Sequence, residues 1–140
     1  LDILFMYSIT QTYGILVHTQ YIKKMPRWFE AIFVTPAHHR VNHASNVRYL
    51  DKNMGMCLII WDRMFGTFQD EVAEDPIKYG LTKPVTNAHN PFNHVNHEWK
   101  EIRNDMKKDL PLSVKLKYLL MPPGWSHNGS TQTAAQMRKE

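Results

Sequence analysis

The chain reads Pro36-Ala37-His38-His39-Arg40-Val41-Asn42-His43-Ala44-Ser45-Asn46 at its densest histidine cluster, where three of the eight histidines fall within six positions. Imidazole is the commonest metal ligand among side chains, and clustering brings several neutral ring nitrogens to one point. A helical turn here would place His39 and His43 on one face, because they are four residues apart. The stretch therefore predicts a metal site on a short helix, without naming the metal.

Two further histidines are candidates for the same centre. His18 follows an apolar run, at the point where a helix would leave a membrane, and it is able to point toward the cluster. Taken alone, His18 fits an interfacial polar residue, but beside the cluster we favour a ligand. His38 adjoins His39 and is either a ligand or a group just outside the metal's ligands.

Two carboxylates flank the apolar block 56–61. A metal-bound histidine usually donates its second ring N–H to a carboxylate or a carbonyl, and Asp51 is a candidate for this role. For Asp62 we favour a structural ion pair with Arg63 or Arg40.

The histidines at 89, 94 and 97 form a looser second group. The spacing His94-x-x-His97 is compatible with metal binding, but a metal site is not the favoured interpretation of this group, since no partner of matching geometry is evident.

The beginning of the chain is apolar. Residues 1–17 carry a single charge, Asp2, and are fewer than the about 20 residues that a membrane-spanning helix needs. The first residue is not Met, so we expect a fragment or a processed product that begins inside such a helix. Lys23, Lys24 and Arg27 follow the apolar run, and the positive-inside rule places them and the histidine cluster on the cytoplasmic side. The alternative is an ordinary solvated basic loop.

The rest of the pattern is helical, which predicts an all-α fold. Residues 25–33 suit a short amphipathic helix at a membrane interface, because they contain one tryptophan and two phenylalanines. A core helix of a soluble domain is the alternative. Residues 1–17 and 54–65 should leave a large exposed apolar surface. Further helices are expected at residues 56–65, 96–108 and 111–120.

Composition excludes several classes of function. The net charge is +4, but Trp28, Phe29 and Trp61 lie in apolar runs rather than among lysines, so no nucleic acid partner is expected. Cys57 is the only cysteine, which rules out an internal disulfide and a zinc site built from several thiolates. The sequence has no glycine-rich phosphate loop and no nucleophilic triad pattern.

Several separated motifs resemble one known family. The chain resembles the fatty acid hydroxylase/sterol desaturase superfamily in three runs, which are Thr35-Pro36-Ala37-His38-His39-Arg40-Val41-Asn42-His43, Asp51-Lys52-Asn53-Met54-Gly55 and Leu58-Ile59-Ile60-Trp61-Asp62-Arg63-Met64-Phe65-Gly66-Thr67-Phe68. The runs Val17-His18-Thr19-Gln20 and Tyr79-Gly80-Leu81-Thr82-Lys83-Pro84-Val85 are similar to the branch that includes alkylglycerol monooxygenase. The resemblance extends from about Gly14 to Trp125, with the motifs in the family's order.

The resemblance implies an integral membrane, all-α enzyme with a cytosolic histidine-rich cap. Such enzymes hold a dinuclear iron centre in histidine boxes and use O₂ to hydroxylate or desaturate a lipid or sterol-like substrate. Their reducing equivalents come from a cytochrome, a ferredoxin or, in the ether-lipid branch, a pterin. Residues 1–70 would then form the C-terminal part of the hydroxylase domain, and residues 71–140 a C-terminal extension.

The family's last box reads histidine, two residues, then two adjacent histidines, and it falls here on His39, Asn42 and His43. His18 matches the isolated histidine before that box. Asn42 departs from the pattern, and an amide is a much weaker iron ligand than imidazole. Either Asn42 lies outside the direct ligands of the metal, or His38 replaces the missing imidazole, or the protein has lost activity.

The family's earlier boxes would precede residue 1. This chain would therefore supply His18, His39, His43 and possible ligand His38, about half of a diiron ligand set. Two alternatives remain: a catalytically inactive family member with a lipid-binding or structural role, and a small soluble histidine–metal protein.

Overall fold

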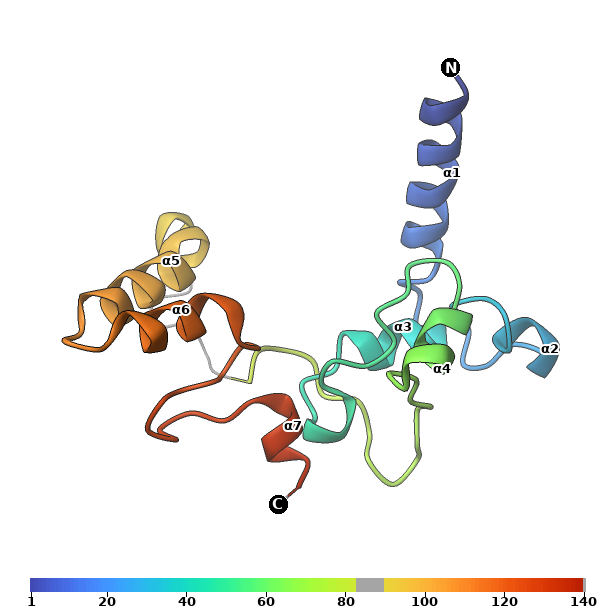
Figure 1. Ribbon diagram of the computed structural model, residues 1–140. Coiled ribbons are helices and arrows are strands. Elements are labelled where there is room, and N and C mark those ends of the chain that lie inside the picture. Colours follow the sequence, from blue (N-terminus) through green and yellow to red (C-terminus); the bar gives the residue numbers. More distant parts are fainter. Residues whose placement is uncertain (83–89, 140) are drawn as a thin grey trace. The chain divides into compact units, whose positions relative to one another are not determined.

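A computed structural model describes residues 1–82 and 90–139 (Figure 1). The chain divides into two compact units, Leu1–Gly80 and Leu81–Glu140. The first unit contains α1 (Asp2–Leu16), α2 (Arg27–Glu30), α3 (Pro36–Asn42), the 3₁₀ turn η1 (Val47–Tyr49) and α4 (Ile60–Phe65). The second contains α5 (Pro91–Lys107), α6 (Leu112–Leu120) and α7 (Ala134–Met137). Within the described ranges the only β structure is two isolated bridges, so these residues are mostly helical, as predicted.

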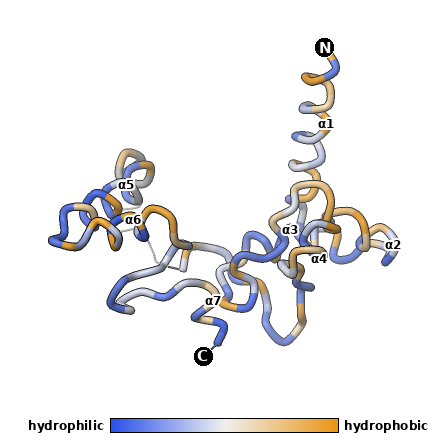
Figure 2. The backbone as a smooth tube through the Cα atoms, viewed as in Figure 1, coloured by the Kyte–Doolittle hydropathy of each residue, from blue (hydrophilic) through white to orange (hydrophobic). Residues whose placement is uncertain are grey.

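Helix α1 has no buried residue, and its apolar side chains are not confined to one face. Figure 2 shows the helix as a mixture of hydrophobic and more hydrophilic residues. Ile3 is 85% exposed and Leu16 is 63% exposed. The predicted exposure also holds in the second apolar segment for Met64 and Phe65, whereas Ile59 is fully buried. Across the described residues, we find no helix that combines the length and the hydropathy needed to cross a membrane.

The hydrophobic core cluster of the first unit is formed by Val41, Ala44 and Tyr49, with Val72 and Ile77 packed against it. Backbone bonds join the segment around residues 32–34 to other parts of the unit. The N–H of Val34 donates to Cys57 O at 2.9 Å, and the N–H of Ile59 donates to Ile32 O at 3.0 Å. The hydroxyl of Tyr13 donates to Val34 O at 2.6 Å, which joins α1 to the entry of α3. These long-range contacts satisfy buried backbone groups that no helix can pair.

Asn53 joins α3 to the segment that follows α4. Its side chain is fully buried, and its amide nitrogen donates to His38 O at 3.2 Å and to Gln69 O at 2.7 Å. Its amide oxygen accepts the N–H of Gln69 at 2.9 Å. The backbone φ of 51° lies in the left-handed region, which asparagine tolerates better than most residues.

Asp62 has a structural role, but its partners are not the arginines expected from the sequence. Its buried carboxylate accepts the N–H of Met54 at 2.8 Å, the N–H of Gly55 at 2.9 Å and the hydroxyl of Thr67 at 2.6 Å. The carboxylate thus closes the turn before α4 onto the end of that helix. Three donors on one carboxylate satisfy most of its lone pairs, which is what allows it to be buried.

The two arginines make other contacts. Arg40 donates to Glu71 Oε2 at 2.7 Å and to the carbonyls of Ile22 and Lys23 at 2.9 and 2.8 Å. Arg63 donates to Glu30 O at 3.3 Å. Arg40 therefore holds the segment before α2 against the segment after α4.

Residues 72–78 pack onto the first unit. The amide of Asn46 donates to Asp75 Oδ1 at 2.6 Å and accepts the N–H of Lys78 at 2.8 Å. The hydroxyl of Tyr49 donates to Asp75 O at 2.8 Å. The unit accordingly ends at Gly80, while the family-domain boundary near residue 70 stays a prediction.

Several helices differ in length from those predicted. The interfacial helix expected over residues 25–33 is reduced to α2, because the chain turns after Glu30 and the segment 32–34 bonds to the 57–59 segment. The same bonds delay the start of α4 to Ile60. The first helix ends at Leu16, close to the end of the apolar run 1–17, whereas α5 begins at Pro91, before residue 96.

Asp62→Ala should destabilise the fold substantially. The substitution leaves the N–H groups of Met54 and Gly55 without their acceptor, and we expect the free energy of unfolding to fall by about 2–4 kcal/mol. Thermal unfolding of the detergent-solubilised protein measures the effect. Glu74→Ala, which removes an exposed carboxylate, is the control and should change little. Equal melting temperatures for both variants would contradict the structural role of Asp62.

Candidate metal centre

The cluster begins with a short helix whose N-terminus is fixed by sequence. Thr35 precedes α3 in an extended conformation, and Pro36 occupies its first turn, where a missing N–H is harmless. His39 lies in the helix and His43 follows its last residue, with the N–H of His43 donating to His39 O at 3.2 Å. This single turn brings both imidazoles to one face, as predicted.

His18 approaches the same face from the end of α1. Its N–H donates to Ile15 O at 3.2 Å, and its ring Nδ1 lies 2.6 Å from Gly14 O. A carbonyl oxygen only accepts, so Nδ1 carries the proton and Nε2 of a neutral ring is a bare lone pair. The Gly14–His18 anchor was not recognised from the sequence, although its i, i+4 spacing is a signal that helices provide.

The three rings converge on one point. His39 Nε2 lies 2.9 Å from His18 Nε2 and 3.0 Å from His43 Nε2. One ligand nitrogen from each ring lies within 4.8 Å of the other two. Metal–imidazole bonds are about 2.0–2.1 Å long, so neighbouring ligand nitrogens on one ion lie about 3 Å apart. The spacing of the three nitrogens therefore fits one face of a metal ion.

Hydrogen bonding alone does not satisfy these three nitrogens. With a neutral His18 presenting a lone pair, His39 Nε2–H is able to donate to His18 or His43 but not fully to both. If His39 Nε2 instead carries no proton, His43 Nε2–H is able to donate to it. The contact between His39 Nε2 and His18 Nε2 then brings two lone pairs together. In every neutral arrangement one close contact lacks a well-placed proton. A cation at the centre removes the conflict.

His39 has the protonation state that a ligand requires. Burial lowers the pKa of its imidazole to about 4, with smaller contributions from His18 and His43. The ring is therefore neutral at pH 7, and a neutral imidazole is the form that binds metal. His39 Nδ1 is buried and has no hydrogen-bond partner among the described residues. His18 and His43 are exposed, so one side of the cluster is open.

The structure does not bring His38 to the cluster. Its side chain is 1% exposed, its Nδ1 accepts the N–H of Thr35 at 3.3 Å, and its ring packs edge-on against Phe68. Burial lowers the pKa of this imidazole also. Its ligand role, left open by the sequence, is not supported, and the ring packs inside the first unit instead.

The two residues predicted to lie just outside the ligands are not seen in contact with them. Asn42 is the last residue of α3 and is half-buried. Asp51 is exposed, with a positive φ of 54°, and among the described residues it makes no hydrogen bond to the three rings. Their proposed roles remain predictions.

The second histidine group is only partly within the described residues. His89 lies outside them, while His94 and His97 both belong to α5. Metal binding by this group stays untested.

Comparison with known proteins gives a consistent family. The fatty acid hydroxylase family model matches residues 1–67. Alkylglycerol monooxygenase of Caenorhabditis elegans is 38% identical over 128 residues, which cover 83% of this chain and 24% of that protein. The human alkylglycerol monooxygenase is 35% identical over 113 residues, covering 81% of this chain and 24% of that protein. An ornithine lipid hydroxylase of Rhizobium tropici is 28% identical over 110 residues, covering 75% of this chain and 32% of that protein.

The chain thus spans about a quarter of the length of the alkylglycerol monooxygenases that it matches. No solved structure matches the chain. The family resemblance drawn from the separated motifs is confirmed.

Loss of a buried histidine should lower the stability of the fold far more than loss of an exposed one. His38→Ala removes the acceptor of the Thr35 N–H and leaves a cavity, and it should lower the free energy of unfolding by about 2–4 kcal/mol. His43→Ala removes an exposed ring and should change the stability of chelator-treated protein by less than about 1 kcal/mol. Denaturant titration of metal-free protein in detergent separates the two. A more severe loss for His43→Ala would overturn these assignments.

Proposed function

Since residues 1–67 belong to the fatty acid hydroxylase family, we propose that this chain carries part of the iron centre of a membrane-bound lipid oxygenase. His18, His39 and His43 are the ligands that it supplies. The parent enzyme is a hydroxylase or monooxygenase acting on a lipid or sterol-like substrate, and a desaturase reaction belongs to the same proposal. The lipid monooxygenases and hydroxylases among its relatives support this reaction class.

The convergence of three Nε2 atoms without enough protons to join them is the observation that carries the proposal. Imidazole sites accept iron, zinc, copper and nickel, so the donor set alone does not choose the metal. Membership of the family favours iron. Three nitrogens are too few for a dinuclear centre, and we propose that ligands outside this chain complete it.

Bound iron would supply the activation of O₂ for oxidation of a C–H bond. The chain's residues prepare the site for it. His39 offers a neutral lone pair from a half-buried ring, and the Gly14 carbonyl fixes the orientation and the tautomer of His18. The exposed side of the cluster leaves room for further ligands and for substrate. A cytochrome, a ferredoxin or a pterin is the proposed electron donor.

We further propose that α1 belongs to a membrane-embedded segment. Its apolar side chains are exposed around the whole helix, which suits contact with hydrocarbon rather than with water. Lys23, Lys24 and Arg27 follow it and place the histidine cluster on the cytoplasmic side by the positive-inside rule. Residues 71–140 would form an extension of the hydroxylase domain.

A catalytically inactive family member with a lipid-binding or structural role is the second candidate. Asn42 favours it, because this amide stands where the family has an imidazole. Iron content and turnover of the full-length protein distinguish the two candidates.

Removal of the central imidazole should empty the site. For His39→Ala in the full-length protein we expect iron content and lipid oxidation to fall by about tenfold or more, since the ring that contacts both neighbours is lost. Metal analysis by mass spectrometry and product formation from lipid measure the two quantities. His127→Ala, a change in the second unit, should retain both. Turnover at the wild-type level in His39→Ala would exclude the iron assignment.

Asn42→His tests whether the departure from the family box is tolerated. In an active enzyme the added imidazole should keep or raise iron occupancy, because it offers a stronger ligand at a position that the family uses. Iron content and lipid oxidation of the full-length protein are again measured. A wild type lacking both, with both restored by Asn42→His, would identify a decayed enzyme instead.

A further inference from the structure

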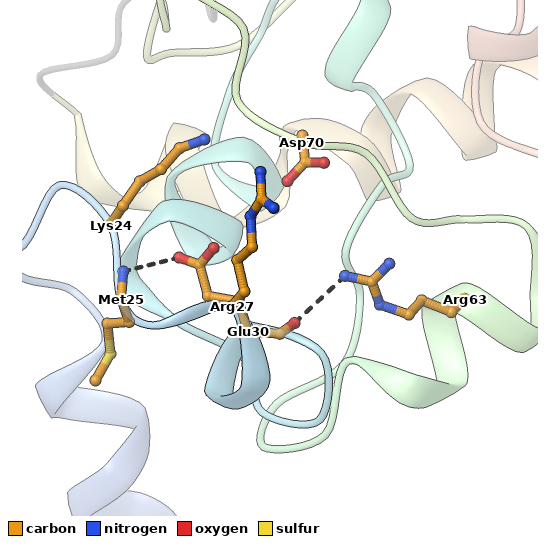
Figure 3. A pocket seen from close by; sticks show the side chains of 6 residues that line it. All are labelled: Lys24, Met25, Arg27, Glu30, Arg63 and Asp70. Carbon is orange, nitrogen blue, oxygen red and sulfur yellow. Dashed lines mark hydrogen bonds between the residues drawn. The ribbon is translucent and has the colours of Figure 1, made fainter.

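A second polar site lies in the first unit, and it shares no residue with the histidine cluster. It is a cleft of about 360 Å³, which falls within the size range of small-ligand pockets. Figure 3 shows its lining, which comes from the segment before α2, from α2, from α4 and from the segment after α4. The side chains that line it are those of Lys24, Met25, Arg27, Glu30, Arg63 and Asp70.

The cations of this cleft are not neutralised by its carboxylates. Glu30 accepts the N–H of Met25 at 3.0 Å and the hydroxyl of Thr35 at 3.4 Å, so its carboxylate is turned toward neutral donors. Within the described part of the chain, neither Lys24 nor Arg27 forms an ion pair.

Arg63 also lacks a carboxylate partner among the described residues. Its guanidinium donates to the backbone carbonyl of Glu30 at 3.3 Å (Figure 3). It also lies 3.7 Å from the centre of the Phe68 ring. Arg40, in the same unit, is instead paired with Glu71 at 2.7 Å. The fold therefore pairs a buried guanidinium but leaves three cations around one cleft available to an anion.

We propose that this cleft binds the phosphodiester group of a membrane glycerophospholipid. Three cations and two carboxylates give the lining a net charge of +1, which complements the single negative charge of a phosphodiester. Guanidinium groups match the phosphate oxygens with paired donors, and a lysine adds a compact charge. The site would hold a lipid at the edge of the protein, apart from the substrate to be oxidised.

The neighbouring apolar side chains favour a lipid over a soluble phosphodiester. Met25 lines the cleft itself, and α2 carries Trp28, which is 69% exposed, between Arg27 and Glu30 in sequence. Ile32, just after α2, is 44% exposed. Exposed tryptophan next to basic residues is typical of protein surfaces that lie at the headgroup level of a bilayer.

Calorimetric titration of the full-length protein in neutral detergent tests the site. The probes are dioctanoylphosphatidylglycerol, dioctanoylglycerol, which lacks phosphate, and glycerophosphoglycerol, which lacks acyl chains. The double variant Lys24→Gln/Arg27→Gln removes two exposed cations of the cleft. The matched control, Lys23→Gln/Lys117→Gln, removes two exposed lysines outside it. Thermal unfolding and iron content verify that each variant is folded and that the histidine site is intact.

We expect saturable binding of the phospholipid, weakened about tenfold or more in the cleft variant and less than about twofold in the control. Dioctanoylglycerol should bind at least about tenfold more weakly than the phospholipid. Equal weakening in both variants would show diffuse charge attraction and overturn the proposal. Equal affinity for dioctanoylglycerol would overturn it as well. If glycerophosphoglycerol bound as tightly as the phospholipid, the proposal that the bound phosphodiester belongs to a lipid would be wrong. Loss of iron in wild type would leave this result unaffected, because the two sites are separate.

Discussion

Asn53 is the side chain on which the arrangement of the first unit depends most. From a position with no solvent exposure it bonds to the carbonyl of His38 and to both backbone groups of Gln69. α3 is a helix of seven residues, too short to be stable by itself. Its orientation therefore comes from such contacts, and with it the direction in which His39 and His43 point. Asp62 supports Asn53 by holding the backbone directly after it.

The part of the site that sequence could predict is the part governed by local periodicity. His39 and His43 are one helical turn apart, so their shared face follows from helix geometry once Pro36 marks the start of the helix. The approach of His18 was expected from the apolar run that ends beside the cluster and from the family resemblance, because no local rule relates residues 18 and 39. Neither the periodicity nor the family resemblance could predict that the His38 ring is buried apart from the other three histidines. Neighbouring residues in a helix point in different directions, and which of the two faces the core depends on packing by distant residues such as Phe68.

The same limit explains the helix boundaries and the ion pairs. Residues 32–34 and 57–59 are apolar and suit a helix or a strand equally well, and their mutual backbone bonds keep both segments outside the neighbouring helices. Arg40 was expected near Asp62, yet it reaches Glu71, which is nearer to it in the fold although farther in sequence. Helical class and the histidine cluster were thus predictable, whereas pairings across the fold were not.

The hydrogen bond between the His18 ring and the Gly14 carbonyl couples the cluster mechanically to α1. His18 Nε2 moves with the last turn of that helix, while His39 and His43 move with α3. In the membrane arrangement proposed above, a bilayer of different hydrocarbon thickness changes the tilt of an embedded helix. A change in the tilt of α1 would then alter the distance between His18 and its two partners. By the same coupling, a metal held by all three rings would restrict the tilt of α1.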